Sequence, residues 1–407
     1  MRVVHISTAD NIGGSGRSAY KIHKGLEALG VESKMLVGYK SCADDTVEKI
    51  SDGINALSDK IVGKITNQLS MQYLFLPSSI RLLKTPQIKS ADIIQLYNTH
   101  GNYFSHSVLP ALSRLKHVFW RLSDMWPMTG HCTYSGDCSL WMTGCKSCPD
   151  LANYPSLTFD TAGLLWKWKK SLYSRSNIHV IAPSLWMKDI ATNSPLLNRF
   201  NISVIPNGVD TGVFKPLNKL ACRDKLKIPS NKKVILFLAH VVKDNPRKGG
   251  GVFIEVMNKL AKEHDVFALI VGDGAEQWAD EITSPALRHG FVNDDELLAA
   301  IYNSADIILH PAVSENLPNS VLEAMACGVP AVAFDVGGVK DIVRHMETGY
   351  LARQKDFDDL YRGVEMLLTD PALYGALSTN CLNRVLLSYT LKAQAQSFSA
   401  LYSATLK

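Results

Sequence analysis

The sequence predicts an α/β protein built from two domains, each containing a parallel sheet covered by helices. Short apolar segments rich in valine, isoleucine and leucine alternate with longer helical patterns, which is typical of parallel α/β layers. The apolar segments form two series, and a turn-rich stretch at residues 205–210 separates them. The chain has 407 residues, 46% of them hydrophobic, so it is long enough to bury two cores of ordinary size.

The two series of expected strands define the two domains. The first series comprises residues 3–7, 33–37, 92–97, 118–122, 179–182 and 203–206. The second series comprises residues 234–239, 266–271, 306–310 and 331–334. We therefore expect an N-terminal domain over residues 1–212 and a C-terminal domain over residues 213–385.

The composition argues against nucleic acid as a partner. The formal net charge is +5, from 43 basic and 38 acidic residues. This mild excess suits an anionic small ligand or an anionic membrane surface, and it is far from the basic stripe of a nucleic-acid-binding protein. The first residues enter a strand without a signal-like segment, and no run approaches the ~18 apolar residues that span a bilayer. We therefore expect a cytoplasmic protein.

The most informative stretch is 310–330, which joins an expected strand to an expected helix and carries Glu315 and Glu323, eight residues apart. The strand at 306–310 is apolar enough to be buried and parallel, so its carboxyl end places Glu315 where α/β proteins bind ligands. Glu323 has two interpretations. It can bind a ligand, or it can close a capping box with Ser320, because the two residues have S-x-x-E spacing.

A second ligand-binding feature follows the strand at 331–334. Gly337 and Gly338 come after it, and a helix is expected to begin at Val339. Free backbone amides and the helix dipole at such a turn favour an anion.

Together these segments resemble a known family. The spacing E-x7-E inside P-x3-E-N-L-P-N-x2-L-E-A-M-A-C-G-V-P, followed by V-G-G-V-x-D-I-V and T-G-Y-L, is similar to the donor-binding half of the retaining glycosyltransferases of the large family 4. The resemblance implies a GT-B fold, in which two Rossmann-like domains with parallel sheets face a central cleft. The last helix, here 386–407, then packs back on the N-terminal domain. Glu315 would hold donor-sugar hydroxyls beside the donor contacts Asn316 and Leu317. Glu323 would hold the ribose hydroxyls.

Two cations in the C-terminal half are candidates for binding the donor diphosphate. Arg247 and Lys248 lie in an expected loop after the strand at 234–239, and a guanidinium fork beside an ammonium group suits phosphate oxygens. R-K-G at this place resembles the phosphate clamp of the family. Where the family often has Gly-Arg directly after that strand, this chain has Ala-His, so His240 and Lys243 are the candidates for a further cation.

The resemblance also implies a mechanism. Arg247, Lys248 and the turn at Gly337 and Gly338 would stabilise the negative charge that grows on the β-phosphate as the sugar leaves. In this type of enzyme the leaving phosphate takes the acceptor proton on the same face, which gives retention. We therefore expect a nucleoside-diphosphate sugar as co-substrate, with no divalent metal or other cofactor required for catalysis.

The first expected strand leads to a glycine-rich turn at residues 13–17, before a helix expected at about 18–29. Glycines let a backbone approach a phosphate closely, and a helix N-terminus supplies amide donors. The turn lacks the G-x-G-x-x-G spacing, so a nicotinamide cofactor is not expected. In the resembled family the matching loop lies against the donor diphosphate or the acceptor, which implies contacts from Gly14, Ser15 and Gly16.

Polar side chains follow two strands of the N-terminal series. His100 comes after the strand at 92–97, and Ser123 and Asp124 follow the strand at 118–122. Residues just past strand ends are site candidates in an open α/β sheet. The family commonly has His-Asp where this chain has Ser-Asp. Either Ser123 makes a weaker contact to the donor sugar, or His100 supplies the imidazole.

A cysteine-rich loop follows, with four of the eight cysteines within 17 residues: Cys132, Cys138, Cys145 and Cys148. In a cytoplasmic protein such density favours a structural zinc site, with His131 as an alternative to one thiolate. Disulfides and free thiols stay open, because C-x5-C is not a standard zinc spacing. D-M-W-P-M-T-G-H-C with a downstream C-P resembles a subset of family 4 linked to surface polysaccharide assembly.

Two segments bear on the acceptor. Residues 57–84 and 164–170 mix apolar or indole side chains with lysine and arginine, a pattern that either packs on its own domain or rests at a lipid interface. With the family context, these segments favour a lipid-linked glycan acceptor and peripheral contact with the cytoplasmic face of the inner membrane.

We therefore expect a retaining glycosyltransferase that moves a sugar from a nucleoside-diphosphate sugar to a glycan acceptor. A GT-B epimerase acting on nucleotide sugars and a non-enzymatic nucleotide-sugar-binding protein would share the fold and are the alternatives. An epimerase gives an epimer when no acceptor is present, and a binding protein never releases nucleoside diphosphate.

Overall fold

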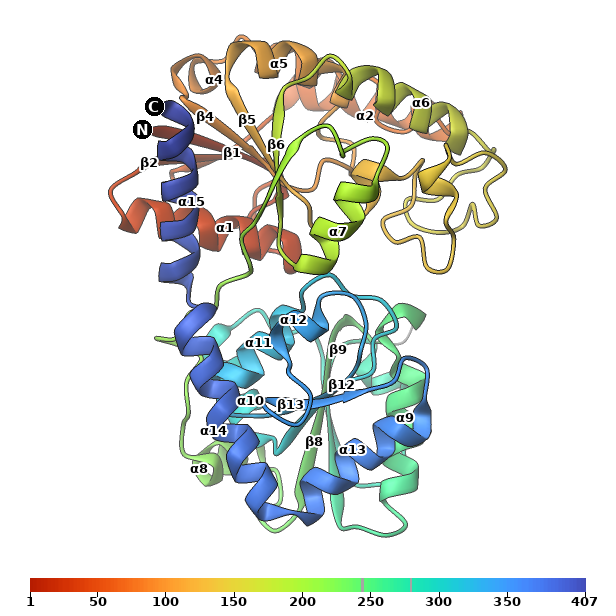
Figure 1. Ribbon diagram of the computed structural model, residues 1–407, viewed down its shortest axis with the longest axis vertical. Coiled ribbons are helices and arrows are strands. Elements are labelled where there is room, and N and C mark those ends of the chain that lie inside the picture. Colours follow the sequence, from red (N-terminus) through yellow and green to blue (C-terminus); the bar gives the residue numbers. More distant parts are fainter. Residues whose placement is uncertain (243–244, 279) are drawn as a thin grey trace. The chain divides into compact units, whose positions relative to one another are not determined.

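The computed structural model describes residues 1–242, 245–278 and 280–407. The chain divides into two compact units (Figure 1). The first unit comprises residues 1–206 and 394–407, and the second comprises residues 207–393. Each unit is built around its own parallel sheet, so the predicted class of two parallel-sheet α/β domains is confirmed.

The first unit contains a seven-stranded sheet in which all neighbouring strands are parallel. In spatial order the strands are β3 (Val47–Lys49), β2 (Glu32–Tyr39), β1 (Arg2–Ala9), β4 (Ile93–Leu96), β5 (His117–Arg121), β6 (Ile178–Ala182) and β7 (Asn201–Val204). Alternate residues face opposite sides of a sheet. Val4 and Ile6 of β1 belong to one hydrophobic cluster and Val3 to another, so the sheet is buried on both faces. This is why its strands are almost continuously apolar.

Helices cover both faces of this sheet (Figure 1). The α-helices of the first unit are α1 (Gly13–Ala28), α2 (Gly53–Gln68), α3 (Pro77–Leu82), α4 (Pro86–Ser90), α5 (Leu109–Leu115), α6 (Ala162–Tyr173), α7 (Leu185–Asn193) and the end of α15 (Leu391–Leu406). Short 3-10 turns are η1 (His106–Val108), η2 (Trp126–Met128) and η3 (Leu140–Met142).

Helix α15 brings the end of the chain back to the first unit. Phe398 and Tyr402 are fully buried in its core, and the Tyr402 hydroxyl donates a hydrogen bond to Gln95 Oε1 at 2.7 Å. The two chain ends therefore lie close together in Figure 1.

The second unit contains a six-stranded sheet, also parallel throughout. In spatial order its strands are β10 (Ala286–His289), β9 (Val266–Asp273), β8 (Lys233–Val241), β11 (Ile307–His310), β12 (Ala331–Phe334) and β13 (Gly349–Ala352). Its helices are α8 (Lys219–Leu226), α9 (Gly250–Leu260), α10 (Asp295–Ser304), α11 (Asn319–Ala326), α12 (Val339–Ile342), α13 (Phe357–Thr369) and α14 (Pro371–Ser388), with 3-10 turns η4 (Pro246–Lys248) and η5 (Ala275–Trp278).

The units divide at slightly different residues from those we expected. Residues 207–212 belong to the second unit, where Val209 pairs with Thr390 in an isolated bridge. The return to the first unit begins with α15 and not at residue 386, because α14 packs Leu377 and Val385 into the core of the second unit.

The strands β3, β10 and β13 were not predicted from the sequence. All three are short edge strands of their sheets. An edge strand pairs on one side only and needs fewer apolar side chains, so its pattern is weak; β10, for example, reads ALRH.

Candidate functional site

The candidate residues of the second unit lie on two loops that follow neighbouring strands. Arg247 and Lys248 lie in η4 after β8, and Glu315 lies between β11 and α11. Because β8 and β11 pair in parallel, both loops leave the same edge of the sheet. This edge, at the carboxyl ends of the strands, is where open α/β sheets bind ligands.

The structure joins two features that the sequence analysis treated separately. Glu315 Oε2 forms an ion pair with Lys248 Nζ, and Arg247 Nη1 lies 3.4 Å from the same oxygen. Arg247 also donates to the Ser314 carbonyl at 2.7 Å. Burial would raise the pKa of Glu315, but the positive charges of Lys248 and Arg247 lower it to about 2. The cluster thus holds two cations against one carboxylate, which favours an anionic ligand.

Backbone contacts fix these loops to each other. Val313 N donates to Arg247 O at 2.9 Å, and Gly249 has φ +74° and packs so closely on Pro311 O that a Cβ would collide with it. The cations and the carboxylate are therefore held in register by main-chain packing.

The predicted anion site at Gly337 and Gly338 packs on the same loop. Gly337 has φ +54°, and a Cβ there would collide with Glu315 O. The Gly338 amide donates to this oxygen at 3.2 Å, so it is already engaged. Helix α12 behind it is a single turn, which makes its dipole small. These glycines support the main chain of Glu315.

The structure corrects one interpretation of Glu323. Helix α11 begins at Asn319 with Pro318 as N-cap, so Ser320 lies inside the helix and the capping box is wrong. Proline carries no side-chain group that could cap. The Glu323 side chain is 7% exposed and accepts a hydrogen bond from the Tyr302 hydroxyl at 3.0 Å. Asn316 and Leu317, before the helix, are buried.

Sequence reasoning missed His310. Its ring is buried, and Nε2 lies 3.9 Å from Glu315 Oε2 with no hydrogen-bond partner among the described residues. Burial lowers the pKa of His310 to about 4, so the ring is neutral at physiological pH. The sequence signal that could have identified His310 is its position as the polar last residue of an otherwise apolar strand. His240 lies at the exposed end of β8, and Lys243 is outside the described residues.

In the first unit, Gly14, Ser15 and Gly16 lie in the first turn of α1, which begins at Gly13 and not near residue 18 as predicted. The helix starts earlier because Gly16 fits against Asp10 O, where a Cβ would come within 2.5 Å. Ser15 Oγ lies 2.9 Å from Ser123 Oγ, so the glycine-rich turn contacts the position where the resembled family has histidine.

The structure brings His100 and Asp124 together. His100 Nε2 lies 3.0 Å from Asp124 Oδ2, and the Trp126 amide donates to Asp124 Oδ1 at 2.9 Å. Both side chains are buried. His100 Nδ1 is buried as well and has no partner in the part of the chain that the structure describes. An orphaned acceptor or donor at a strand end is a candidate ligand contact.

The four cysteines of the loop form no disulfide in the described part of the chain, and His131 beside them is buried. His131 Nε2 lies 3.3 Å from Cys148 Sγ, and the Gly130 amide donates to Cys145 Sγ at 3.1 Å. Over residues 1–242, 245–278 and 280–407, three His, Cys, Asp or Glu ligand atoms lie within 4.8 Å of one another only at Glu263, His264 and Glu365. The thiols are thus not gathered into one shell.

Residues 232–370 match the family described as Glycosyl transferases group 1. This range extends from the start of β8 to the end of α13 and contains Arg247, Lys248, Glu315 and Glu323. Over these residues the second unit is therefore similar to the glycosyl transferases group 1.

Individual relatives agree with this class. The chain is 27% identical over 235 residues to the putative colanic acid biosynthesis glycosyl transferase WcaC of Escherichia coli K12, covering 56% of this chain and 54% of the relative. It is 25% identical over 252 residues to the E. coli UDP-Gal:alpha-D-GlcNAc-diphosphoundecaprenol alpha-1,3-galactosyltransferase, covering 59% and 63%. The chain spans about half the length of the curated relatives it matches.

The fold is that of GT-B glycosyltransferases. Anabaena HepE, solved in complex with UDP-glucose, superposes with a TM-score of 0.68 at 16% identity, over 99% of both chains. In the part of the chain that the structure describes, no helix is both long and apolar enough to cross a membrane.

Proposed function

We propose that the protein is a retaining glycosyltransferase that moves a sugar from a nucleoside-diphosphate sugar to a lipid-linked glycan acceptor in surface polysaccharide assembly. The observation that carries the proposal is the cluster of Arg247, Lys248 and Glu315 at the carboxyl edge of the sheet in the second unit, within the residues that match the group 1 family. Buried ion pairs stabilise a fold little more than apolar side chains of similar volume would. Folding stability alone therefore does not explain a buried carboxylate with two cations at a ligand-binding edge.

The donor would bind through the two cations. Transfer of the sugar leaves negative charge on the β-phosphate, and preorganised positive charge is the main means of stabilising it. Arg247 and Lys248 already point toward one oxygen of Glu315, so a diphosphate can share or replace that contact. HepE, of the same fold, is described with UDP-glucose, which supports a nucleotide sugar as the donor. No divalent metal is needed in this scheme.

Glu315 and Glu323 would bind hydroxyl groups. A carboxylate accepts two hydrogen bonds from a vicinal diol. Glu315 would hold the donor sugar beside Asn316 and Leu317, and Glu323 would hold the ribose. Neither carboxylate then acts as a general acid, and the leaving phosphate takes the acceptor proton on the same face of the sugar.

In the first unit, His100 would bind a hydroxyl group of the donor sugar. The His100 tautomer that donates Nε2–H to Asp124 leaves Nδ1 as an acceptor, and Nδ1 has no protein partner among the described residues. A sugar hydroxyl can supply the missing donor. This favours His100 over Ser123 as the residue that contacts the donor sugar. Gly14, Ser15 and Gly16 would contact the donor phosphate or the acceptor from the first turn of α1.

The names of two relatives support our proposal for the acceptor class. One is named a putative colanic acid biosynthesis glycosyl transferase, and the name of the other gives GlcNAc-diphosphoundecaprenol as its acceptor. We extend this to the present chain as a glycan on a diphosphate lipid, reached by peripheral contact with the cytoplasmic membrane face.

We also propose a structural zinc ion in the cysteine loop, held by three or four of Cys132, Cys138, Cys145 and Cys148, with His131 as the alternative ligand. His131 Nδ1 lies 2.9 Å from the Pro155 carbonyl, which can only accept, so Nδ1 carries the proton and Nε2 presents its lone pair. A structural zinc site requires a closed tetrahedral shell of ligands, so zinc binding would have to draw these ligand atoms together, because no three of them lie within 4.8 Å of one another among the described residues.

Elemental analysis of protein purified without added metal tests the zinc site. We expect about one zinc per chain. Cys145→Ser should release it, whereas Cys42→Ser, outside the loop, should keep it. Metal-free active protein with four alkylatable thiols, or two disulfides found by mass spectrometry, would contradict this site.

A panel of nucleotide sugars tests the function. Thermal shift identifies the donor, and nucleoside-diphosphate release with and without glycan acceptor then separates the classes. A glycosyltransferase releases nucleoside diphosphate and does so faster with acceptor. An epimer formed without acceptor would identify an epimerase, and donor binding without release would identify a binding protein.

Two variants tie the activity to the cluster. Lys248→Ala and Arg247→Ala should each lower turnover by roughly 10²-fold or more, the effect of losing one preorganised stabiliser of developing charge. Lys259→Ala, on the outer face of α9 beside Asp358, is the matched control and should keep full turnover. Near wild-type rates for both cluster variants at saturating donor would contradict the phosphate assignment.

A further inference from the structure

Helix α2 of the first unit carries its apolar side chains on the outside. Ile54 is 85% exposed, Leu57 57%, Ile61 53%, Ile65 51% and Leu69, just past the helix, 58%. Their spacing of three or four residues places all five on one helix face. We call this set the α2 apolar face. A helix that covers a sheet normally buries such a face.

The inner side of α2 is polar and small. The buried residues of the helix are Asp59 and Gly63. Asp59 Oδ1 accepts from the Ser78 amide at 3.1 Å, and Gly63 lies against Asn102, where a Cβ would come within 3.2 Å of Oδ1. These contacts hold α2 on its unit, so its large apolar residues are not used for folding. Single exposed hydrophobics need no explanation, but a continuous stripe of five does.

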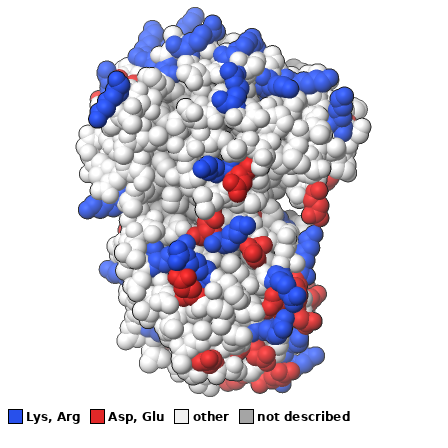
Figure 2. All heavy atoms as spheres, in the orientation of Figure 1, with Lys and Arg blue, Asp and Glu red and all other residues white. Residues whose placement is uncertain are grey.

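Basic side chains predominate around this face, although Asp52, the N-cap residue of α2, is also exposed. Between residues 53 and 91 the exposed charged side chains are Lys60, Lys64, Arg81, Lys84 and Lys89. The single acid of this segment, Asp59, is buried at 5% exposure. Figure 2 shows the same bias along the edge of the first unit over α4, α5 and α6, where Lys and Arg far outnumber Asp and Glu. An apolar stripe flanked by cations is the pattern of a helix that lies in the surface of an anionic bilayer.

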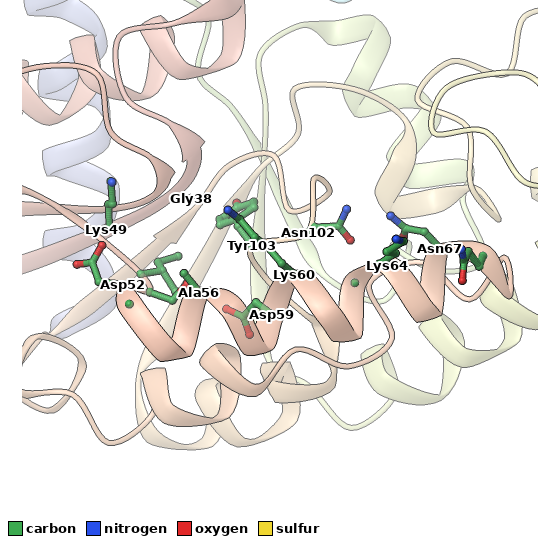
Figure 3. Close-up of a pocket in the computed structure, with 15 residues that line it drawn as sticks. Gly38, Lys49, Asp52, Ala56, Asp59, Lys60, Lys64, Asn67, Asn102 and Tyr103 are labelled. Carbon is green, nitrogen blue, oxygen red and sulfur yellow. The ribbon is translucent and has the colours of Figure 1, made fainter.

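A pocket of about 690 Å³ lies along the other flank of α2. Lys49, Lys60, Lys64, Asn102 and Tyr103 are among its lining residues. Figure 3 shows Lys60 and Lys64 rising from α2 toward the segment of Asn102 and Tyr103. By their positions on the helix, the two lysines lie between the pocket and the α2 apolar face. A lipid whose tail is in the bilayer would bring its phosphate to this place.

We propose that the α2 apolar face docks on an anionic phospholipid bilayer, with Lys60 and Lys64 against the lipid phosphates and the pocket open to the headgroup. The inference deepens the proposed function and rests on it in one respect, because a lipid-linked acceptor has to be met at a bilayer. Docking itself requires neither donor nor acceptor.

Vesicle cosedimentation of the full-length protein tests the proposal, with phosphatidylcholine vesicles that contain or lack phosphatidylglycerol. We expect binding to the anionic vesicles that weakens with added salt. Leu57→Gln combined with Ile61→Gln should reduce the partition coefficient about tenfold or more, since two apolar side chains leave the bilayer. Lys60→Gln and Lys64→Gln should each reduce it about fivefold.

Leu387→Gln is the matched control, because Leu387 is 83% exposed on α14 of the second unit and should not affect vesicle binding. All of these side chains are exposed, so unfolding should not confuse the result. Absence of binding to anionic vesicles, or an equal loss in the control, would overturn the proposal. A dimer detected by light scattering and broken by the Leu57 and Ile61 changes would assign the face to a second copy of the chain instead.

Nucleoside-diphosphate release in detergent solution distinguishes this failure from failure of the proposed function. Release with no vesicle binding would overturn the docking face and leave the transferase assignment standing. Vesicle binding with no nucleoside-diphosphate release from any nucleotide sugar would overturn the transferase assignment and leave the docking face standing.

Discussion

Glu315 is a carboxylate held between two cations, and its charge and its shape can be separated by one substitution. Glu315→Gln keeps the shape but removes the charged acceptor that, in the proposed function, holds hydroxyl groups of the donor sugar, so the sugar is positioned less precisely. A displacement of catalytic groups of about 1 Å can cost roughly 10²-fold in rate. We expect a fall of this size in turnover while nucleoside-diphosphate binding, which uses the two cations, is retained. Steady-state rates and calorimetric titration measure the two quantities.

The control is Glu347→Gln, an exposed carboxylate paired with Arg344 on the surface of the second unit. It should change neither quantity. If Glu315→Gln instead lowered nucleotide affinity and turnover together, the carboxylate would be needed to build the phosphate site itself.

Glu323 offers a second test, because its capping interpretation is wrong and the two roles to compare are ligand binding and a packing role that includes the bond to Tyr302. Glu323→Gln keeps an acceptor for the Tyr302 hydroxyl but loses the charged acceptor for a ribose diol. We expect weaker nucleotide binding by calorimetry with little change in Tm.

Tyr302→Phe is the matched variant for the Glu323 experiment. It removes the donor of the hydrogen bond to Glu323 and should lower the free energy of unfolding by about 1 kcal/mol. Nucleotide affinity should be retained. A lower Tm with unchanged affinity in Glu323→Gln would assign the carboxylate to packing.

Among the elements, α15 lies farthest in sequence from the core that it completes. Phe398 and Tyr402 fill the core of the first unit from the other end of the chain. Phe398→Ala should lower the free energy of unfolding by about 3–5 kcal/mol, and Tyr402→Phe, which removes the bond to Gln95, by about 1 kcal/mol. Urea denaturation measures both. Leu406→Ala, on an exposed turn of the same helix, should cost little, and an equal loss there would contradict a packing role.

Features that depend on local sequence were predicted, whereas features that depend on contacts between distant residues were not. Interior strands such as β1 and β11 were predictable, because burial on both faces requires a continuous apolar run. Edge strands such as β3 were missed, because one-sided pairing tolerates a run as polar as VEK. The predicted start of α1 was late, because glycines suggest a loop unless their close packing on Asp10 is known.

The candidate site shows this limit most clearly. Glu315 and Lys248 were each predicted from local motifs, but their ion pair spans 67 residues and depends on β8 and β11 being neighbours in the sheet. The pairing of His100 with Asp124 depends in the same way on β4 and β5. Spacing in a sequence indicates which residue types can act, whereas sheet order determines which of them meet.

At the scale of the whole molecule, each constellation is assembled inside one unit. Arg247, Lys248 and Glu315 are fixed by the second unit, and His100 and Asp124 by the first. Main-chain packing, such as that of Gly249 on Pro311, fixes the backbone that carries the cations within their unit. Preorganisation of this kind is what electrostatic stabilisation of a leaving phosphate requires.

Buried histidines make the stability of the whole molecule depend on pH. Burial lowers the pKa of His5 and His106 well below the usual value of about 6.5 and that of His310 to about 4. In the unfolded chain these rings take up protons near pH 6.5, and in the folded protein they do not. Between pH 6.5 and about 4 the unfolded state therefore binds more protons, and stability falls as the pH falls. For His310 alone the full effect is roughly 3 kcal/mol. The pKa of Glu315, lowered to about 2 by Lys248 and Arg247 against the effect of burial, adds a further loss below its ordinary range near pH 4.5.

We therefore expect the free energy of unfolding, measured by urea titration at a series of pH values, to decrease steadily from pH 7 toward pH 4. His310→Gln should flatten part of this slope, because glutamine takes up no proton in the unfolded chain, whatever its own cost to packing. The comparison rests on the slope with pH and not on the absolute stability of the variant. A wild-type curve that is flat over this range, or a variant with an unchanged slope, would show that the ring of His310 is protonated as readily in the folded protein as in the unfolded chain.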